Sequence, residues 1–327
     1  MSPHHPREKS QSRNTDELPR FRFWTLLIMS RSYNPSDFSG LLEKYADQRP
    51  LGRSRWSTGR ARNEPRPGRE EVIQERLANR YRKSYQIDSR NYALRESEIF
   101  TLKELGKFRV ISLEDLSRCG YDEHRARLEQ DLQHLKNQRL ISDRQIETRE
   151  NPNSRVLSLT KEGKRFLRQQ HLVPKEQALY DGFRKPKELA HDAGLYRLYQ
   201  RIATEIEMNG GSVRRVILDF ELKEQLYRDL NRASAKDPAQ HQSQVAARHG
   251  LKVVSGSIPI PDLRIEYEND AHGIERIDLE LATREYRSHG LAAKARAGFH
   301  LYARHQDVDR LRRVMDHQEI TARIFAL

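Results

Sequence analysis

The stretch from residue 260 to residue 283 constrains the fold most, because apolar and polar residues alternate along it in two segments. A period of two is the pattern of a half-buried β-strand, and it holds over residues 260–268 and again over residues 277–283. Residues 269–273 between them, Asn-Asp-Ala-His-Gly, are of types that favour turns. The stretch is therefore predicted to form a β-hairpin.

Three acidic side chains accompany this hairpin. Alternation places Asp278 and Glu280 on one face of the second strand, and Asp262 begins the first strand directly after Pro261. Carboxylates that converge repel one another unless a cation or a proton neutralises them, which indicates a divalent metal held by Asp262, Asp278 and Glu280. The alternative is a hairpin with one solvent-facing side, on which acidic residues are ordinary. Spacing alone leaves both interpretations open.

The overall charge favours an anionic partner. The chain of 327 residues has a formal net charge of +13, so nucleic acid is the first candidate and an anionic membrane surface is the second. Cys119 is the only cysteine, which excludes a disulfide within the chain and a zinc site built from cysteines. The longest nearly apolar run, residues 23–29, is far shorter than a membrane span. We therefore expect a cytoplasmic protein that does not enter a membrane.

Composition and periodicity divide the chain into a tail, two domains and the segments between them. The expected parts are a basic disordered tail at 1–68, a lead-in helix at 69–91, a first domain at 92–171, a linker at 172–186 and a second domain at 187–327. Residues 1–90 contain 19 Lys and Arg against 11 Asp and Glu, which is +8 of the total charge. The apolar content of residues 1–68 is too low to offset the entropy lost when a backbone becomes ordered. The tail either adds sequence-independent affinity for phosphates or is a solvated linker, and residues 21–29 have no assigned role.

The pattern in residues 92–171 predicts helices joined by a tight turn. Apolar residues three apart predict a first helix, and Ser112, which precedes an acidic first turn, predicts the N-cap of a second helix. Gly120 is expected to supply a left-handed turn between this second helix and a third one over residues 122–138. Two short helices across such a turn form a helix-turn-helix.

The residues that follow predict the wing of a winged helix-turn-helix domain. Strands are expected at 140–141 and 155–159, with turn-forming residues 150–154 between them. The string VLSLTKEGKRFL, residues 156–167, resembles the passage from the wing to the last helix in winged-helix domains.

In a winged helix bound to duplex DNA, the third helix enters the major groove, and Arg and Gln pair with base edges through two hydrogen bonds. The candidate DNA-binding residues are His124, Arg125, Arg127 and Gln130 on the third helix and Arg149 and Arg155 beside the wing. Winged helices also serve as protein-protein modules, so an interaction domain is the alternative.

The second domain, residues 187–327, is predicted to contain a long helix, a strand, a helical insertion at 221–250, the hairpin, a further helix and a final strand. The helix after the hairpin is expected to run from Ser288 through Arg304. The order without the insertion is α-β-β-β-α-β. The predicted fold class is therefore a two-domain mixed α/β protein.

This order, with an acid after proline and acids on the next strand, resembles the core of the PD-(D/E)xK nuclease superfamily, which includes restriction endonucleases. The resemblance implies Mg²⁺ held by two acids and a lysine that aids the attacking water. Asp262 matches the first acid and Asp278 the second, whereas Glu280 stands where the lysine is expected. Some members carry the lysine on the following helix, where Lys294 lies, so the implied catalytic set is Asp262, Asp278, Glu280 and Lys294.

Residues 92–327 together are similar to the replication-relaxation family of bacterial plasmids and conjugative elements. The similarity is carried by residues 189–192 (Leu-Ala-His-Asp), Pro261-Asp262, residues 278–283 (Asp-Leu-Glu-Leu-Ala-Thr), Lys294 and Tyr302. It implies a DNA-binding protein that acts in replication, relaxation or mobilisation of a plasmid or other mobile element, with a relaxase or replication initiator as a further partner. The alternatives are a Mg²⁺-dependent DNA endonuclease and a winged-helix adaptor that binds a relaxase or replication protein. A homodimer is compatible with all three.

Overall fold

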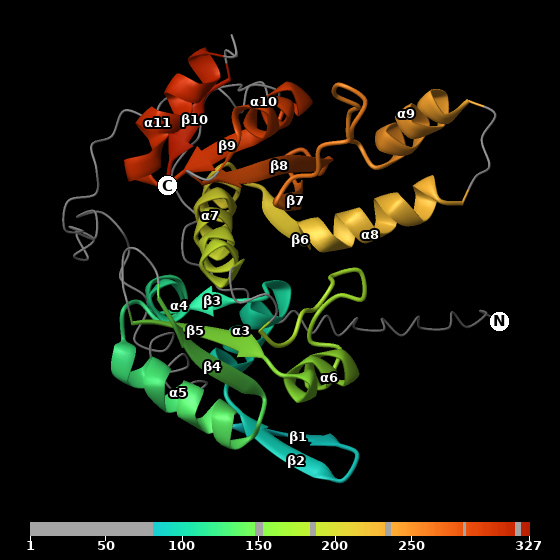
Figure 1. The fold of residues 1–327 in the computed structure, drawn as a ribbon. Helices are drawn as coiled ribbons and strands as arrows, with labels where there is room; N and C mark the ends of the chain where they lie inside the picture. Colours follow the sequence, from blue (N-terminus) through green and yellow to red (C-terminus); the bar gives the residue numbers. More distant parts are fainter. Residues whose placement is uncertain (1–80, 148–152, 184–187, 233–236, 284–285, 318–321) are drawn as a thin grey trace, which may run out of the picture.

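The protein is a mixed α/β chain, seen here in a computed structural model that describes residues 81–147, 153–183, 188–232, 237–283, 286–317 and 322–327 (Figure 1). The expected tail at 1–68, most of the expected lead-in helix and Arg149 lie outside the described residues. The described strands form a two-stranded, a three-stranded and a five-stranded sheet. We call residues 81–183 the first module and residues 188–327 the second module.

The first module begins with a β-hairpin, so the prediction of a lead-in helix up to residue 91 is wrong over its described part. Strands β1 (Lys83–Ile87) and β2 (Arg90–Leu94) pair antiparallel. Asp88 turns the chain with φ of 50°, and Ile87, Tyr92 and Leu94 are buried. Each strand has only five residues, too few for their alternation to be recognised in the sequence.

Four helices and a small sheet follow the hairpin in the described part of the first module. The elements are α3 (Glu96–Lys107), β3 (Ile111–Ser112), α4 (Leu113–Gly120), α5 (Arg125–Asn137), β4 (Ile141–Ile146), β5 (Ser154–Leu159) and α6 (Lys161–Gln169). Strand β5 lies between β3 and β4 and is antiparallel to both. The N-cap predicted at Ser112 is confirmed, because its side chain accepts a hydrogen bond from the Asp115 N–H at 3.0 Å.

Gly120 has a different role from the predicted one. It is the last residue of α4, and the left-handed turn before α5 is made by Asp122 and Glu123, with φ of 46° and 64°. A Cβ on Gly120 would lie 2.4 Å from a ring carbon of Phe100. Glycine is therefore needed here for the close approach of α3 to α4, whereas an Asp tolerates the left-handed conformation of the turn.

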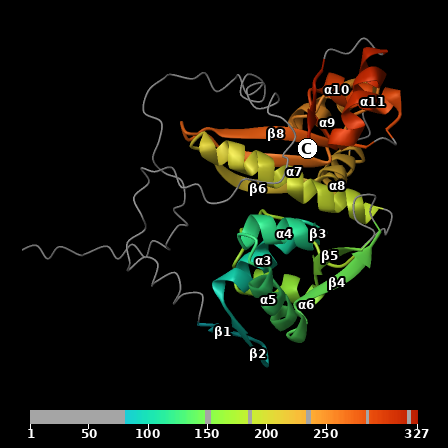
Figure 2. The same cartoon turned by 90° about the vertical axis from the view of Figure 1, so that its left-hand side faces the viewer.

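The second module is built on the five-stranded sheet, in the order β10-β9-β8-β7-β6. Strands β6, β7 and β8 pair antiparallel, and β8, β9 and β10 pair parallel. The elements are α7 (Leu189–Met208), β6 (Ser212–Leu218), α8 (Asp219–Leu230), α9 (Pro238–Arg248), β7 (Leu263–Glu268), β8 (Ile274–Ala282), α10 (Ser288–Ala297), β9 (His300–Ala303), α11 (His305–Asp316) and β10 (Ile324–Ala326). Helix α7 packs on β6, β7 and β8, and α10 and α11 lie on the other side of the sheet (Figures 1 and 2).

The hairpin predicted from the alternation is confirmed as β7 and β8. Helices α8 and α9 occupy much of the stretch expected to be a helical insertion, and α8 begins two residues before it. The helix expected from Ser288 through Arg304 is shorter. It ends at Ala297, where Gly298 takes φ of 90°, and residues 300–303 form β9 instead. Leu301, Tyr302 and Ala303 are fully buried in the sheet. These residues are too few to show a period in the sequence, so their packing in the sheet determines that they form a strand.

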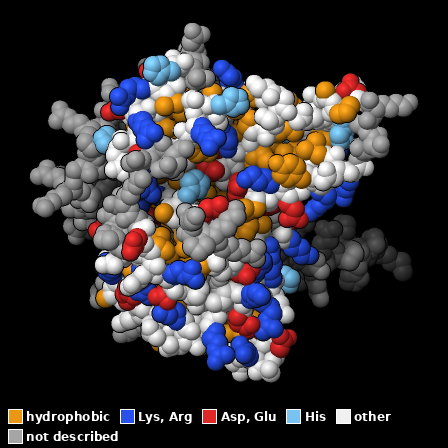
Figure 3. Space-filling model, viewed as in Figure 1, with side chains coloured by type: hydrophobic (Ala, Val, Ile, Leu, Met, Phe, Trp, Pro, Cys, Tyr) orange, Lys and Arg blue, Asp and Glu red, His pale blue; other side chains and the backbone are white. Residues whose placement is uncertain are grey.

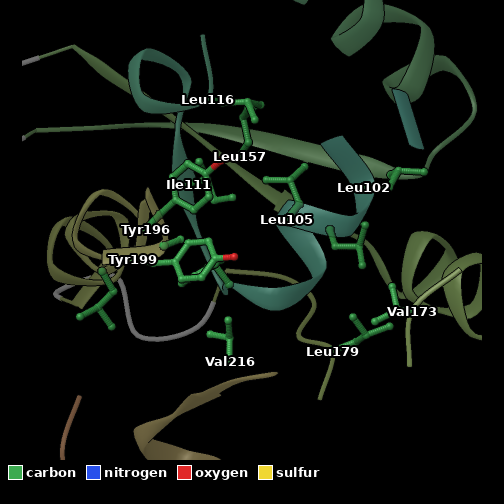
Figure 4. Close-up of a cluster of buried hydrophobic side chains, with 14 of the residues drawn as sticks. Leu102, Leu105, Ile111, Leu116, Leu157, Val173, Leu179, Tyr196, Tyr199 and Val216 are labelled. Carbon is green, nitrogen blue, oxygen red and sulfur yellow. The ribbon is translucent and has the colours of Figure 1, made fainter. Parts of the chain in front are cut away.

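Helix α7 joins the two modules through a shared apolar core (Figure 4). The ring of Phe108 lies 5.2 Å from that of Tyr196 and 5.1 Å from that of Tyr199, both on α7. Around this core, Arg197 donates to both carboxylate oxygens of Asp115, at 2.9 and 3.2 Å.

Among the described residues, no helix is long and apolar enough to cross a membrane.

Replacing Phe108, which is 1% exposed, tests this continuity. Phe108→Ala is expected to lower the free energy of unfolding by about 3–5 kcal/mol, because it leaves a cavity between the modules. Denaturant unfolding followed by circular dichroism should show one transition shifted as a whole. Tyr227→Ala, at a side chain that is 54% exposed, is the control and should change stability by less than about 0.5 kcal/mol. Two separate transitions would contradict a shared core.

Candidate functional site

The chain places two acidic side chains next to each other where β7 begins. Leu263 and Leu279 are paired across β7 and β8, so Asp262 and Glu280 are the next positions along the two strands. The Asp262 N–H donates to Glu280 Oε2 at 3.2 Å, and the Leu281 N–H donates to Asp262 Oδ2 at 3.0 Å. Each carboxylate is thus fixed by the backbone of the neighbouring strand.

Lys294 reaches this pair from α10. Its Nζ donates to Glu280 Oε2 at 2.8 Å and to the carbonyl oxygen of Ile260. The hydroxyl of Tyr286 donates to the other carboxylate oxygen of Glu280. The Glu280 side chain is completely buried, whereas that of Lys294 is 18% exposed. A buried carboxylate requires such partners, since an unpaired one is costly to remove from water.

His191 joins the site from the first turn of α7. Its Nε2 lies 3.2 Å from Asp262 Oδ2, and both side chains are partly accessible to solvent. The site therefore combines groups from five places in the second module: α7, the start of β7, β8, the connection before α10, and α10. We call Asp262, Glu280, Lys294, His191 and Tyr286 the β7–β8 site.

Asp278 is engaged elsewhere. Both of its carboxylate oxygens accept hydrogen bonds from Arg264, at 2.6 and 2.8 Å, and Arg264 also donates to the carbonyl of His249. Of the four catalytic candidates, the structure brings together Asp262, Glu280 and Lys294 and pairs Asp278 with a buried guanidinium. Arg264 was not predicted, although its place directly across from Asp278 follows from the register of the hairpin.

The environment shifts the titration of the acids in opposite directions. Burial, together with the charge of Asp262, raises the pKa of Glu280 to about 7, which Lys294 and Tyr286 partly oppose. Burial would also raise the pKa of Asp262, but the hydrogen bond and charge of His191 and the charge of Lys294 bring it below its usual range. Burial disfavours the charged form of His191, yet the hydrogen bond and charge of Asp262 outweigh it and raise the pKa to about 9. His191 and Asp262 therefore form an ion pair at neutral pH.

The donor set does not fit the Mg²⁺ that the nuclease resemblance implies. Mg²⁺ requires six oxygen ligands in octahedral geometry, and proteins usually supply one or two of them as carboxylates. Within the described ranges, no group of three or more His, Cys, Asp or Glu residues is arranged to hold a metal. The Asp278 oxygens bind Arg264, and the ammonium of Lys294 contacts Glu280 directly. The expected set of Asp262, Asp278 and Glu280 is thus divided among three ion pairs, with His191, Arg264 and Lys294.

A second candidate surface is the outer face of α5. Leu128, Leu132 and Leu135 bury the inner face. The predicted DNA-contacting residues lie on the outside: His124, Arg125 and Gln130 are exposed, and Arg127 is partly exposed. Arg155 is on β5 but is bound to Asp143 and Glu129, at 2.8 and 2.7 Å, so it is less available than the sequence suggests.

A polar pocket adjoins the C-terminal end of α5. It is open to solvent, has a volume of about 330 Å³ and is lined by Arg90, Asn91, Tyr92, Asn137, Gln138 and Arg139. Gln138 attaches the hairpin to the helix, because its Oε1 accepts a hydrogen bond from the Ala93 N–H at 3.2 Å. These residues were not predicted as functional, because the β1–β2 hairpin was not recognised in the sequence.

Comparisons with family models, with curated proteins and with solved structures find no match to this chain. Functional inference for this protein therefore depends on its own residues and their geometry.

The His191–Asp262 ion pair gives a test by titration. In NMR, the His191 imidazole should titrate near pH 9 and return toward about 6.5 in Asp262→Asn, which keeps the shape but removes the charge. Glu266→Gln, on the same strand, is the control and should leave the value unchanged. A wild-type value near 6.5 would contradict the ion pair.

The same shift predicts how stability depends on pH. A histidine whose pKa is raised on folding stabilises the folded state. This contribution is fully present when the pH is below the pKa of the unfolded state, about 6.5, and is lost as the pH rises through the folded pKa of about 9. The contribution is at most about 3 kcal/mol. The difference in free energy of unfolding between wild type and Asp262→Asn should therefore shrink between pH 6.5 and pH 9; a constant difference would be inconsistent with this pair.

Proposed function

We propose that the protein binds duplex DNA through its first module, acting as a winged helix-turn-helix. The element order α3-β3-α4-α5-β4-β5 and the strand order β3-β5-β4 support this proposal. In such a domain α5 is the helix that enters the major groove, and the β4–β5 connection is the wing. The observation that carries the proposal is the outer face of α5, where basic and amide side chains project from a helix whose inner face is fully buried.

The length and chemistry of α5 suit a major groove. Its 13 residues span about 20 Å. Arg125, Gln130, Gln133 and Asn137 are exposed along it, and Arg, Gln and Asn are the side chains that read base edges with paired hydrogen bonds. Figure 3 shows Lys and Arg side chains interspersed with acidic ones over both modules. Net charge alone therefore does not locate a DNA-binding face, and α5 is identified by its exposed side chains.

The β1–β2 hairpin extends this surface. Arg90 and Arg139 line the pocket at the far end of α5, and Arg139 is exposed. A phosphate beyond the end of α5 would meet Arg139, whereas Arg90 already lies 3.4 Å from Glu162. Contacts of this kind set the register of the protein on DNA without reading its sequence.

The second module supports a role on DNA that does not include phosphodiester cleavage. Its order α7-β6-β7-β8-α10-β9, with α8 and α9 inserted after β6, supports the proposal of a nuclease-like core. Its acids are neutralised by Lys294, Arg264 and His191. We therefore propose a DNA-binding protein of a plasmid or other mobile element, acting in its replication, relaxation or mobilisation, with a nuclease-like module that does not cleave.

Charge reversal on α5 tests DNA binding. Arg125→Glu/Arg127→Glu is expected to lower the affinity for a fluorescent duplex roughly 10- to 100-fold. Binding should also depend less steeply on salt, because two positive charges that face the DNA are replaced by negative ones. Arg310→Glu/Arg313→Glu on α11 makes the same change in net charge and should leave the affinity nearly unchanged. Equal losses in the two variants would contradict recognition by α5, and a wild type that does not bind duplex would favour the adaptor.

Incubation with supercoiled plasmid separates binding from cleavage. With Mg²⁺ or Mn²⁺ present, we expect no nicking above the level given by Glu280→Gln, because the carboxylates are occupied by Lys294 and Arg264. Agarose electrophoresis provides the measurement. Nicking by the wild type that is lost in Asp262→Asn would establish the endonuclease instead.

A further inference from the structure

We infer that the ammonium group of Lys294 is the resident cation of the Asp262–Glu280 pair, in the position that a divalent metal would otherwise take. The Nζ atom contacts a carboxylate oxygen of Glu280 and the carbonyl oxygen of Ile260. Carboxylate and backbone carbonyl oxygens are also the ligands of hard divalent cations. The inference does not depend on DNA binding by the first module.

The local charges are balanced without a metal. Asp262 carries a negative charge that His191 neutralises, and Glu280 lies beside Lys294. Arg264 neutralises Asp278 on the same face of the hairpin. A divalent ion would add two positive charges to a cluster in which each acid already has a cation, and in a buried site this repulsion is weakly screened.

The ammonium also competes effectively for its position. Lys294 lies on α10, which is held in the second module by the buried Leu291 and Ala292, so its charge is supplied at a high effective concentration. A dissolved metal would have to displace it and shed its own water. Mg²⁺ in particular gives up its water reluctantly.

Removing the lysine should expose the latent site. In Lys294→Met, Asp262, Glu280 and the Ile260 carbonyl keep their places on the strands but lose their cation. A divalent ion that binds the folded state alone raises the melting temperature by mass action. We expect Mn²⁺ to leave the Tm of the wild type unchanged and to raise that of Lys294→Met by about 5 °C or more when present far above its Kd.

The test uses the full-length chain, thermal unfolding with and without Mn²⁺, and electron paramagnetic resonance of free Mn²⁺. Lys294→Met should bind one equivalent of Mn²⁺ and so remove it from solution. The wild type should show no Mn²⁺ binding that depends on Glu280. Lys294→Met/Glu280→Gln is the matched control, and its Mn²⁺ response should be lost. Lys294→Gln, which still offers a donor to Ile260, is the second variant if Lys294→Met does not fold.

Two outcomes would overturn the inference. One is Mn²⁺ binding by the wild type that disappears in Glu280→Gln, which would show that the metal and the lysine coexist. The other is that a folded Lys294→Met or Lys294→Gln protein gains no Mn²⁺ response, or that neither variant folds even with Mn²⁺, since a cation position must be refillable by a cation.

Discussion

The burial of α7 on two sides is the constraint on which the rest of the structure depends. Tyr196 and Ile202 are fully buried, and the helix contacts β3 and α4 of the first module as well as β6, β7 and β8 of the second. Aromatic residues each bury about 150–250 Å², so the cluster of Phe108, Tyr196 and Tyr199 provides a large apolar contact between the modules. Neither module could expose this surface to water without loss of stability, so they are expected to move as one body.

The first turn of α7 connects this packing to the β7–β8 site. His191 and Asp192 are adjacent, and successive helical side chains point in different directions. His191 reaches Asp262 at 3.2 Å, whereas Asp192 lies 3.4 Å from Arg109 of the first module. Burial, partly opposed by Arg109, raises the pKa of Asp192 to about 6. The position of His191 in its ion pair is thus fixed by contacts that also hold the modules together.

Much of the fold followed from local pattern, and the parts that did not have a common cause. The β7–β8 hairpin and the cap at Ser112 were predictable because alternation and capping chemistry act over a few neighbouring residues. Strand β9 and the β1–β2 hairpin were missed because four or five residues do not establish a period. Of the candidate site, Lys294 beside Glu280 was anticipated through a resemblance. The partner of Asp278 depends on strand register, which periodicity does not give.

The pairing of Asp278 with Arg264 shows why side chains on one face of a strand need not form one site. Residues two apart on a strand are separated by about 6.7 Å, enough for each to have its own cation. Arg264 stands directly across from Asp278, and Lys294 enters from α10 over Glu280. The acids on this face therefore separate into two ion pairs, and a row of carboxylates that the sequence presents as a metal site becomes an internally neutralised surface. Cross-strand partners, more than the acids themselves, decide between these two outcomes.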